Sequence, residues 1–146
     1  MGSQIHLVAS PDDFLLEGKL RSILQPLSAE LEVEPEILAD DITPDELAVE
    51  LCSPSLFAPR RLLVTPEVRD WIGAPPPRGL GKREKEDGED EIEPPDVEAL
   101  IQVIEEGFAE GIVLVMRSWC GRQPKSPLID AIAAAGSLYW VPLPLS

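Results

Sequence analysis

Residues 112–116 read Ile-Val-Leu-Val-Met, and this uninterrupted apolar stretch decides the fold. A strand without a polar position is typical of a parallel sheet that is buried on both faces. Helices cover such a sheet, and the sequence on either side of this stretch has helical patterns.

One helix is predicted before the stretch and another after it. Asp96 is placed to cap the first. The apolar face of that helix consists of Val97, Leu100, Ile101, Ile104 and Phe108. Ser126 and Pro127 open the second helix, and Gly136 is predicted to end it in the left-handed conformation. A last strand follows at residues 138–141.

The N-terminal residues predict a strand followed by a long helix. Residues 5–9 form an apolar run, after which Ser10 is placed to cap the helix, with Pro11 at the first helical position. Asp13 would complete a Ser-x-x-Asp capping box. The helix has an amphipathic stripe that consists of Leu16, Leu20, Ile23, Leu24 and Leu27.

The same opening signature returns at Thr43. Pro44 takes the first helical position there, and Glu46 closes a capping box. The short helix that this signature predicts ends at about Cys52, before Pro54.

Three further segments complete the order of elements. Strands are expected at residues 36–39 and 62–65, and residues 66–72 are expected to form a helical turn that carries Trp71. Strand and helix therefore alternate along the chain. This order predicts a three-layer α/β fold with a mainly parallel, five-stranded sheet.

A chain of 146 residues fits one domain that spans the whole length. Within it, residues 73–95 contain three consecutive prolines and a charged run with almost no apolar side chain. This segment is expected to be a disordered, acidic, Pro/Gly-rich insertion. Because strand and helix patterns resume after it, the insertion is not predicted to be a domain boundary.

The charge balance limits the partners. The 12 Lys and Arg residues stand against 27 Asp and Glu residues, which gives a net charge of −15. Phosphate contacts need clustered cations, so the charge balance argues against autonomous DNA binding, and DNA is expected to be reached only through a partner protein. No apolar run approaches the length of a bilayer span and the first residues lack a secretion signal, so no membrane partner is expected and the protein is expected to be cytoplasmic.

The sequence offers little support for a metal or cofactor site. Cys52 and Cys120 lie far apart and His6 is the only histidine, so a zinc site is not expected. The two cysteines are expected to be reduced and buried. At the first strand–helix junction, residues 10–12 read Ser-Pro-Asp, which supplies no glycine and puts a carboxylate where a nucleotide phosphate would bind. No cofactor is predicted.

Catalytic motifs give no support for an enzyme. The sequence has no Gly-x-Ser-x-Gly elbow, and a Ser-His-Asp triad could use only His6. Adjacent carboxylates such as Asp40-Asp41 and Glu105-Glu106 arise freely among 27 acids. The chain is therefore not expected to be an enzyme by itself.

Residues 53–61, Ser-Pro-Ser-Leu-Phe-Ala-Pro-Arg-Arg, carry the strongest functional signal. Leu56 and Phe57 stand between two prolines on a connection from a helix to a strand. Such a pair either packs into the core of its own domain or projects as a hydrophobic anchor for a partner. Arg60 and Arg61 either line the rim of that anchor or offset the acidic surface.

Several motifs together resemble the N-terminal domain of the delta subunit of the bacterial DNA polymerase III clamp loader. The sharpest is Ser-Leu-Phe-Ala-Pro-Arg-Arg-Leu-Leu-Val at residues 55–64. The resemblance spans nearly the whole chain except the insertion. The other matching features are residues 12–17 (Asp-Asp-Phe-Leu-Leu-Glu), residues 45–47 (Asp-Glu-Leu), the apolar stretch at 112–116, Lys125 before a helix, and Gly136 before the last strand.

The resemblance implies an AAA+-like fold without a working P-loop and a role in DNA replication, within a DNA polymerase III holoenzyme. In that family a Leu-Phe element of delta enters an apolar pocket of the sliding clamp, the beta subunit, and favours ring opening, while delta hydrolyses nothing. Carried onto this sequence, the clamp-binding residues are Leu56 and Phe57 as the plug, Ser55 and Pro59 as its turn, and Arg60 and Arg61 beside it.

The lid and collar domains of that family are expected to be absent from this chain. Contacts with other clamp-loader subunits are therefore expected only where a full-length protein carries those domains. Two other functions stay open on the residues alone. The chain is then either a short paralogue that acts as a protein–protein adaptor or a small α/β enzyme that uses acids at strand ends.

Overall fold

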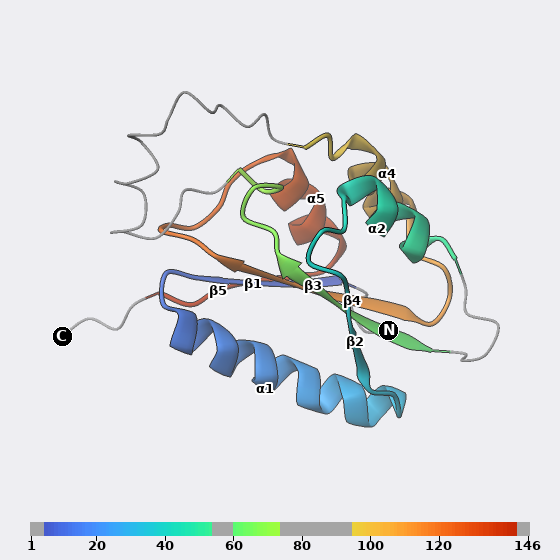
Figure 1. The fold of residues 1–146 in the computed structure, drawn as a ribbon, viewed down its shortest axis with the longest axis horizontal. Helices are drawn as coiled ribbons and strands as arrows, with labels where there is room; N and C mark the ends of the chain where they lie inside the picture. Colours follow the sequence, from blue (N-terminus) through green and yellow to red (C-terminus); the bar gives the residue numbers. More distant parts are fainter. Residues whose placement is uncertain (1–4, 54–59, 74–94, 143–146) are drawn as a thin grey trace.

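The computed structural model describes residues 5–53, 60–73 and 95–142, which form one sheet with helices on both faces (Figure 1). The elements in chain order are β1 (Ile5–Ser10), α1 (Asp13–Leu31), β2 (Pro35–Ile37), α2 (Pro44–Leu51), β3 (Arg61–Glu67), α4 (Glu98–Glu106), β4 (Ile112–Trp119), α5 (Pro127–Ala135) and β5 (Ser137–Trp140). The five strands lie in the order β2-β3-β4-β1-β5, and all neighbours are parallel. The predicted three-layer α/β fold with a five-stranded parallel sheet is confirmed.

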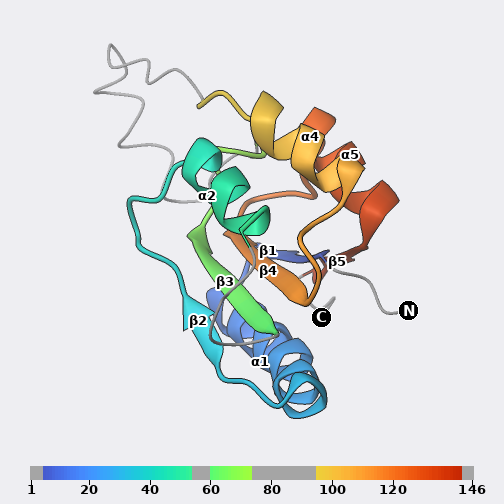
Figure 2. The same cartoon turned by 90° about the vertical axis from the view of Figure 1, so that its right-hand side faces the viewer.

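The helices divide unequally between the two faces of the sheet. Helix α1 lies along one face, and α2, α4 and α5 lie on the other (Figures 1 and 2). Strand β4, which contains the apolar stretch, is central in the sheet, and its Leu114 stands opposite Leu63 of β3 and Ile5 of β1. The stretch is thus enclosed by strands at both edges and by helices on both faces.

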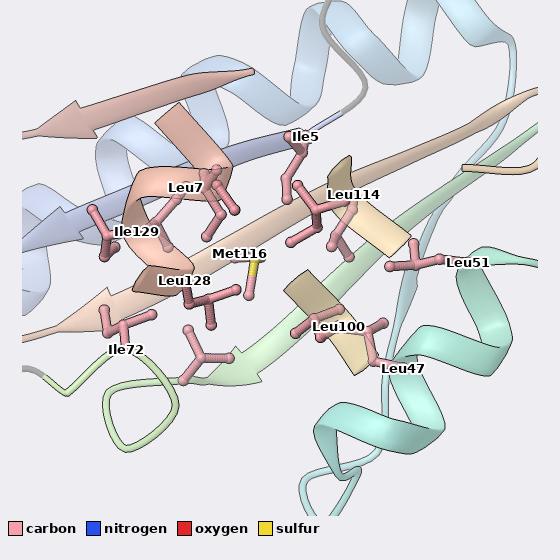
Figure 3. Close-up of a cluster of buried hydrophobic side chains, with 14 of the residues drawn as sticks. Ile5, Leu7, Leu47, Leu51, Ile72, Leu100, Leu114, Met116, Leu128 and Ile129 are labelled. Carbon is pink, nitrogen blue, oxygen red and sulfur yellow. The ribbon is translucent and has the colours of Figure 1, made fainter. Parts of the chain in front are cut away.

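Side chains that alternate along the strands contribute to two separate hydrophobic cores, one on each face of the sheet. On the side of α2, α4 and α5, Leu114 and Met116 pack with Ile5 and Leu7, all fully buried (Figure 3). On the side of α1, Val115 packs with residues of the predicted amphipathic stripe. Leu16, Leu20 and Ile23 of that stripe are buried, and Leu24 and Leu27 pack partly buried against them. Each fully buried Leu or Ile stabilises the fold by about 1.5–3 kcal/mol.

Helix α1 begins later than predicted. Its N-cap is Asp12, and the helix starts at Asp13, so Ser10 is not the cap and Pro11 is not the first helical residue. Ser10 continues β1 instead, because its backbone pairs with β4, where its carbonyl accepts from the N–H of Cys120 at 3.0 Å. Its hydroxyl donates to the carbonyl of Val141, beyond β5, at 2.7 Å and accepts from the N–H of Asp12 at 3.2 Å. A long-range contact outcompetes the local capping box at this position.

The other predicted helix starts are confirmed or nearly so. Thr43 and Glu46 form the capping box of α2, and the Ser126 hydroxyl accepts from the N–H of Ile129 at the start of α5. Helix α4 is the exception, since its N-cap is Val97 rather than Asp96. The Asp96 carboxylate still accepts from the N–H of Glu98 at 2.9 Å, so the helix start moved by one residue.

Gly136 does not adopt the predicted left-handed conformation after α5. Its φ is −156° and its ψ is −135°. Glycine is needed there for space, because a Cβ would overlap the carbonyl oxygen of Ile5 and lie 2.5 Å from the Ile5 Cγ2. The residue lets the chain turn from α5 into β5 directly against β1.

Strand bounds differ from the predictions at several ends. Strand β2 covers residues 35–37 rather than 36–39, and β3 extends two residues beyond the predicted 65, so Pro66 is in the strand and not in a turn. The turn that carries Trp71 follows at residues 69–73, where the N–H of Trp71 donates to the Val68 carbonyl.

Both cysteines are free thiols, but only Cys120 is buried. Cys52 is exposed, contrary to the expectation, and it lies at the C-cap of α2. The predicted insertion at residues 73–95 falls almost wholly outside the described residues.

Candidate functional site

The carboxyl ends of β1 and β4 meet at the edge where open α/β sheets bind ligands. Hydrogen bonds close this edge. The Ser10 carbonyl accepts from the N–H of Cys120 at 3.0 Å, its hydroxyl donates to Val141, and the Trp119 Nε1 donates to the Pro11 carbonyl at 3.0 Å. The first strand–helix junction is therefore bound to the segments that follow β4 and β5.

At this junction the Asp12 carboxylate faces the first amides of α1. One of its oxygens accepts from the N–H of Phe14 at 2.8 Å and from the N–H of Leu15 at 3.2 Å. Amides at such a helix start are the donors that bind a phosphate in nucleotide-binding folds. Here a carboxylate of the chain takes them, and Pro11 offers no N–H. The arrangement places negative charge where a nucleotide would place its own.

A second carboxylate stands at the same edge, at the end of β3. The register of β3 against β4 shifts between Val64 and Glu67. Across this irregularity, Glu67 accepts from the N–H of Trp119 at 2.6 Å and from the N–H of Arg69 at 2.8 Å. The Arg69 guanidinium also donates to the Trp119 carbonyl at 3.0 Å. Glu67 thus replaces part of the interrupted ladder between the two strands.

The surroundings of Glu67 change its acidity. Although the residue reaches solvent, its carboxylate is packed against β4, and this loss of water raises the pKa of Glu67, while the N–H donors oppose the shift. Burial likewise raises the pKa of the Cys120 thiol. A carboxylate with a raised pKa is a feature of the enzyme alternative. However, the bond from the Trp119 N–H to Glu67 joins two strands, and Glu67 is not among the residues that line the three grooves beside α1, beside α2 and between α4 and α5.

The predicted clamp-binding residues belong to the sequence from α2 to β3, which enters the sheet at the amino end of β3, opposite the carboxyl ends described above. Residues 55–60 are in the connection, and Arg61 is the first residue of β3. Residues 54–59 lie outside the described residues, and with them Ser55, Leu56, Phe57 and Pro59. The flanking residues Ser53 and Arg60 are both exposed.

Both ends of this connection are fixed at one place. At the end of α2, the Leu51 carbonyl accepts from the N–H of Ala109 at 2.8 Å. At the start of β3, the N–H of Arg61 donates to the Gly111 carbonyl, also at 2.8 Å. Since residues 109 and 111 belong to the short connection from α4 to β4, the chain leaves and re-enters the fold side by side, at the amino ends of β3 and β4.

The two arginines beside the connection differ in their environments. The Arg61 guanidinium contacts Glu36 of β2 at 3.0 Å and Glu50 of α2 at 3.1 Å, and its side chain is only 16% exposed. Hydrogen bonding to Arg61 lowers the pKa of Glu36, and the same bond raises the pKa of Arg61. Arg61 therefore links β2, β3 and α2, whereas Arg60 is exposed to solvent.

Several of these roles were missed by sequence reasoning. Asp12 carried a local signal, since it precedes a helix directly and Asp is a favoured cap. The contacts of Glu36 and Glu50 with Arg61, and that of Glu67 with the N–H of Trp119, carried none, because the partners are distant in sequence or belong to another element.

Within the described part of the chain, no cluster of three or more His, Cys, Asp or Glu side chains is arranged to hold a metal ion. No helix in the same residues has the length and apolarity that a membrane span requires.

No protein-family model and no curated protein matches the sequence. Among solved structures, the chain is similar to the Bacillus subtilis DNA clamp loader delta protein (YqeN), with 14% sequence identity and a TM-score of 0.63. The likeness covers 97% of this chain and 39% of that protein, so this chain spans well under half of its length. At this identity the likeness shows the fold, and it agrees with the predicted three-layer α/β architecture.

Proposed function

We propose that this chain is a clamp-loader delta-type module that binds a sliding clamp through the Leu56-Phe57 pair and favours ring opening, without ATP hydrolysis of its own. The observation that carries the proposal is the likeness of fold, over 97% of the chain, to a clamp loader delta protein. The partner is a sliding clamp of the beta type. Other clamp-loader subunits are partners only where lid and collar domains are present, and DNA is reached only through the complex.

The anchoring of the α2–β3 connection supports a plug at this position. Its ends are fixed by backbone hydrogen bonds to Ala109 and Gly111, and Arg61 fastens the start of β3 to two neighbouring elements. A short segment with fixed ends loses less conformational freedom on binding than a free tail. A Leu-Phe pair on such a base suits the central, desolvated position of a binding hot spot.

The closed strand–helix junction supports a role without nucleotide. Asp12 occupies the first amides of α1, where a phosphate would bind. The free energy for ring opening would then come from binding, since a ligand that prefers the open clamp shifts the population toward it.

The test is calorimetric titration of the folded chain into the sliding clamp from its own source, beside the Leu56→Ala/Phe57→Ala double variant. Hot-spot residues cost about 2 kcal/mol or more each on truncation, so each substitution should weaken binding by about 30-fold or more. The matched control is Phe14→Ala. It truncates an 85% exposed aromatic side chain in the first turn of α1, after the carboxyl end of β1, and this variant should bind the clamp like the parent.

Circular dichroism of each variant separates the plug from a core role. If the double variant unfolds, Leu56 and Phe57 pack in the core and are not the plug. A folded parent that does not bind the clamp overturns the proposal without any variant.

A further inference from the structure

A groove of about 460 Å³ lies between α4 and α5, and residues of these two helices line it. The two helices lie together on one face of the sheet (Figure 2). The volume is in the range of about 300–1,000 Å³ that ligand and anchor sites occupy. The residues that line it are Ile101, Ile104, Glu105, Pro127, Asp130, Ala131, Ala134 and Ala135.

The lining residues have helical spacing on both walls. On α5 they recur at i, i+3, i+4, i+7 and i+8 from Pro127, which is one face of the helix from end to end. On α4 they recur at i, i+3 and i+4 from Ile101. The α5 face is roughly 12 Å long at 1.5 Å per residue. An elongated groove between two helix faces fits a third helix, whose side chains pack between the existing rows.

The groove has an apolar floor and small residues on its α5 wall. Ile104 and Ala131 are 3% and 6% exposed and form the floor. Ala134 and Ala135 on the α5 wall are exposed. Alanine side chains leave room for the larger apolar residues of an incoming helix, and burial of these residues would supply the binding free energy.

The charge of the rim selects the occupant. Glu105 on α4 and Asp130 on α5 flank the apolar floor, and both are exposed. Helices α4 and α5 contain four acidic residues and no Lys or Arg, and the chain carries a net charge of −15. A second copy of this chain would bring acidic rims together, and nucleic acid would bring phosphates to carboxylates, so both are disfavoured.

The geometry points to a docking site for an amphipathic helix of a partner protein, with an apolar stripe flanked by Lys or Arg. The stripe enters between α4 and α5, and the basic residues meet Glu105 and Asp130. This is the helix-in-groove mode of recognition, with electrostatic complementarity at its rim. It uses residues distinct from the proposed clamp plug, so either site can fail without the other.

The probe is a synthetic helix of about 14 residues, with Leu at helical spacing and Lys on both flanks. It is titrated into the ¹⁵N-labelled full chain, and amide shifts are mapped by NMR. A peptide of the same composition, scrambled to remove the apolar stripe, reports the general attraction of basic peptides to an acidic protein. The expected result is that the ordered peptide shifts the amides of α4 and α5 and that the scrambled peptide does not.

Two variants with the same change of charge complete the test. Ala134→Lys fills the groove, while Ala133→Lys adds the same side chain to an exposed position of α5 outside it. Ala134→Lys should weaken binding of the ordered peptide by about tenfold or more, whereas Ala133→Lys should weaken it by less than about twofold. Equal effects of the two variants, equal binding of both peptides, or the lack of shifts on α4 and α5 would each overturn the docking site.

Discussion

The substitution Gly136→Ala tests how closely α5 and β5 approach β1. The added methyl group would overlap the carbonyl oxygen of Ile5, 2.9 Å from its carbonyl carbon and 2.5 Å from its Cγ2. Two of these three atoms are backbone, so a side-chain rotation cannot relieve the overlap. Ile5 is fully buried, and β1 is paired on both sides, with β4 and with β5.

The expected cost follows from this geometry. Inserting a carbon into a well-packed interior typically costs about 1–3 kcal/mol, and the upper end applies where rigid backbone must move. With about 3 kcal/mol lost, the melting temperature of a chain of this size should fall by about 6–12 °C.

Urea denaturation followed by circular dichroism measures the free energy of unfolding, and a thermal scan gives the melting temperature. The matched control is Gly18→Ala in the interior of α1, where the new methyl group meets no heavy atom within 4 Å. Because alanine is the better helix former, this control should raise the stability by about 0.5–1 kcal/mol. If Gly136→Ala also leaves the stability unchanged or raises it, the close approach of α5–β5 to β1 is refuted.

Two further predictions concern the charged residues of the described sites. Asp12→Ala removes the side chain that accepts two amides at the start of α1, and urea denaturation should show a loss of about 1 kcal/mol. Arg61→Met removes the partner of Glu36 and Glu50, and because these carboxylates are partly exposed the loss at pH 7 should be about 1 kcal/mol or less. The bond to Arg61 lowers the folded-state pKa of Glu36, so its stabilisation is present above the ordinary Glu value and is lost as the pH falls through the lowered one. The difference between parent and Arg61→Met should therefore shrink in acid, and a difference that grows as the pH falls would contradict this role of the ion pair.

Much of the fold was predictable because its signals are local. The stretch at 112–116 indicated a strand buried on both faces, and β4 is the central strand. The Thr43 and Ser126 caps and the leucine stripe of α1 also depend on neighbours within a few residues. Such patterns act before tertiary contacts form, so the sequence alone reveals them.

The errors arose where a distant contact competed with a local one. Ser10 has the chemistry of a cap, but its hydroxyl is bound to the carbonyl of Val141. Gly136 follows a helix, where a left-handed residue is common, but what requires glycine there is the carbonyl of Ile5. In both cases the decisive partner is more than a hundred residues away in the sequence.

The features of the candidate sites also fall into two groups, those set by local sequence and those set by contacts between distant segments. The sequence by itself determined the alternation of strands and helices, the acidic charge, the lack of glycine at the first strand–helix junction, and the Leu56-Phe57 motif, because each depends on residue type and spacing. Only the tertiary structure decided that Arg61 joins three elements and that α4 and α5 share an acidic-rimmed groove. These arrangements arise when the parallel sheet brings distant segments side by side, and a linear pattern carries no record of that proximity.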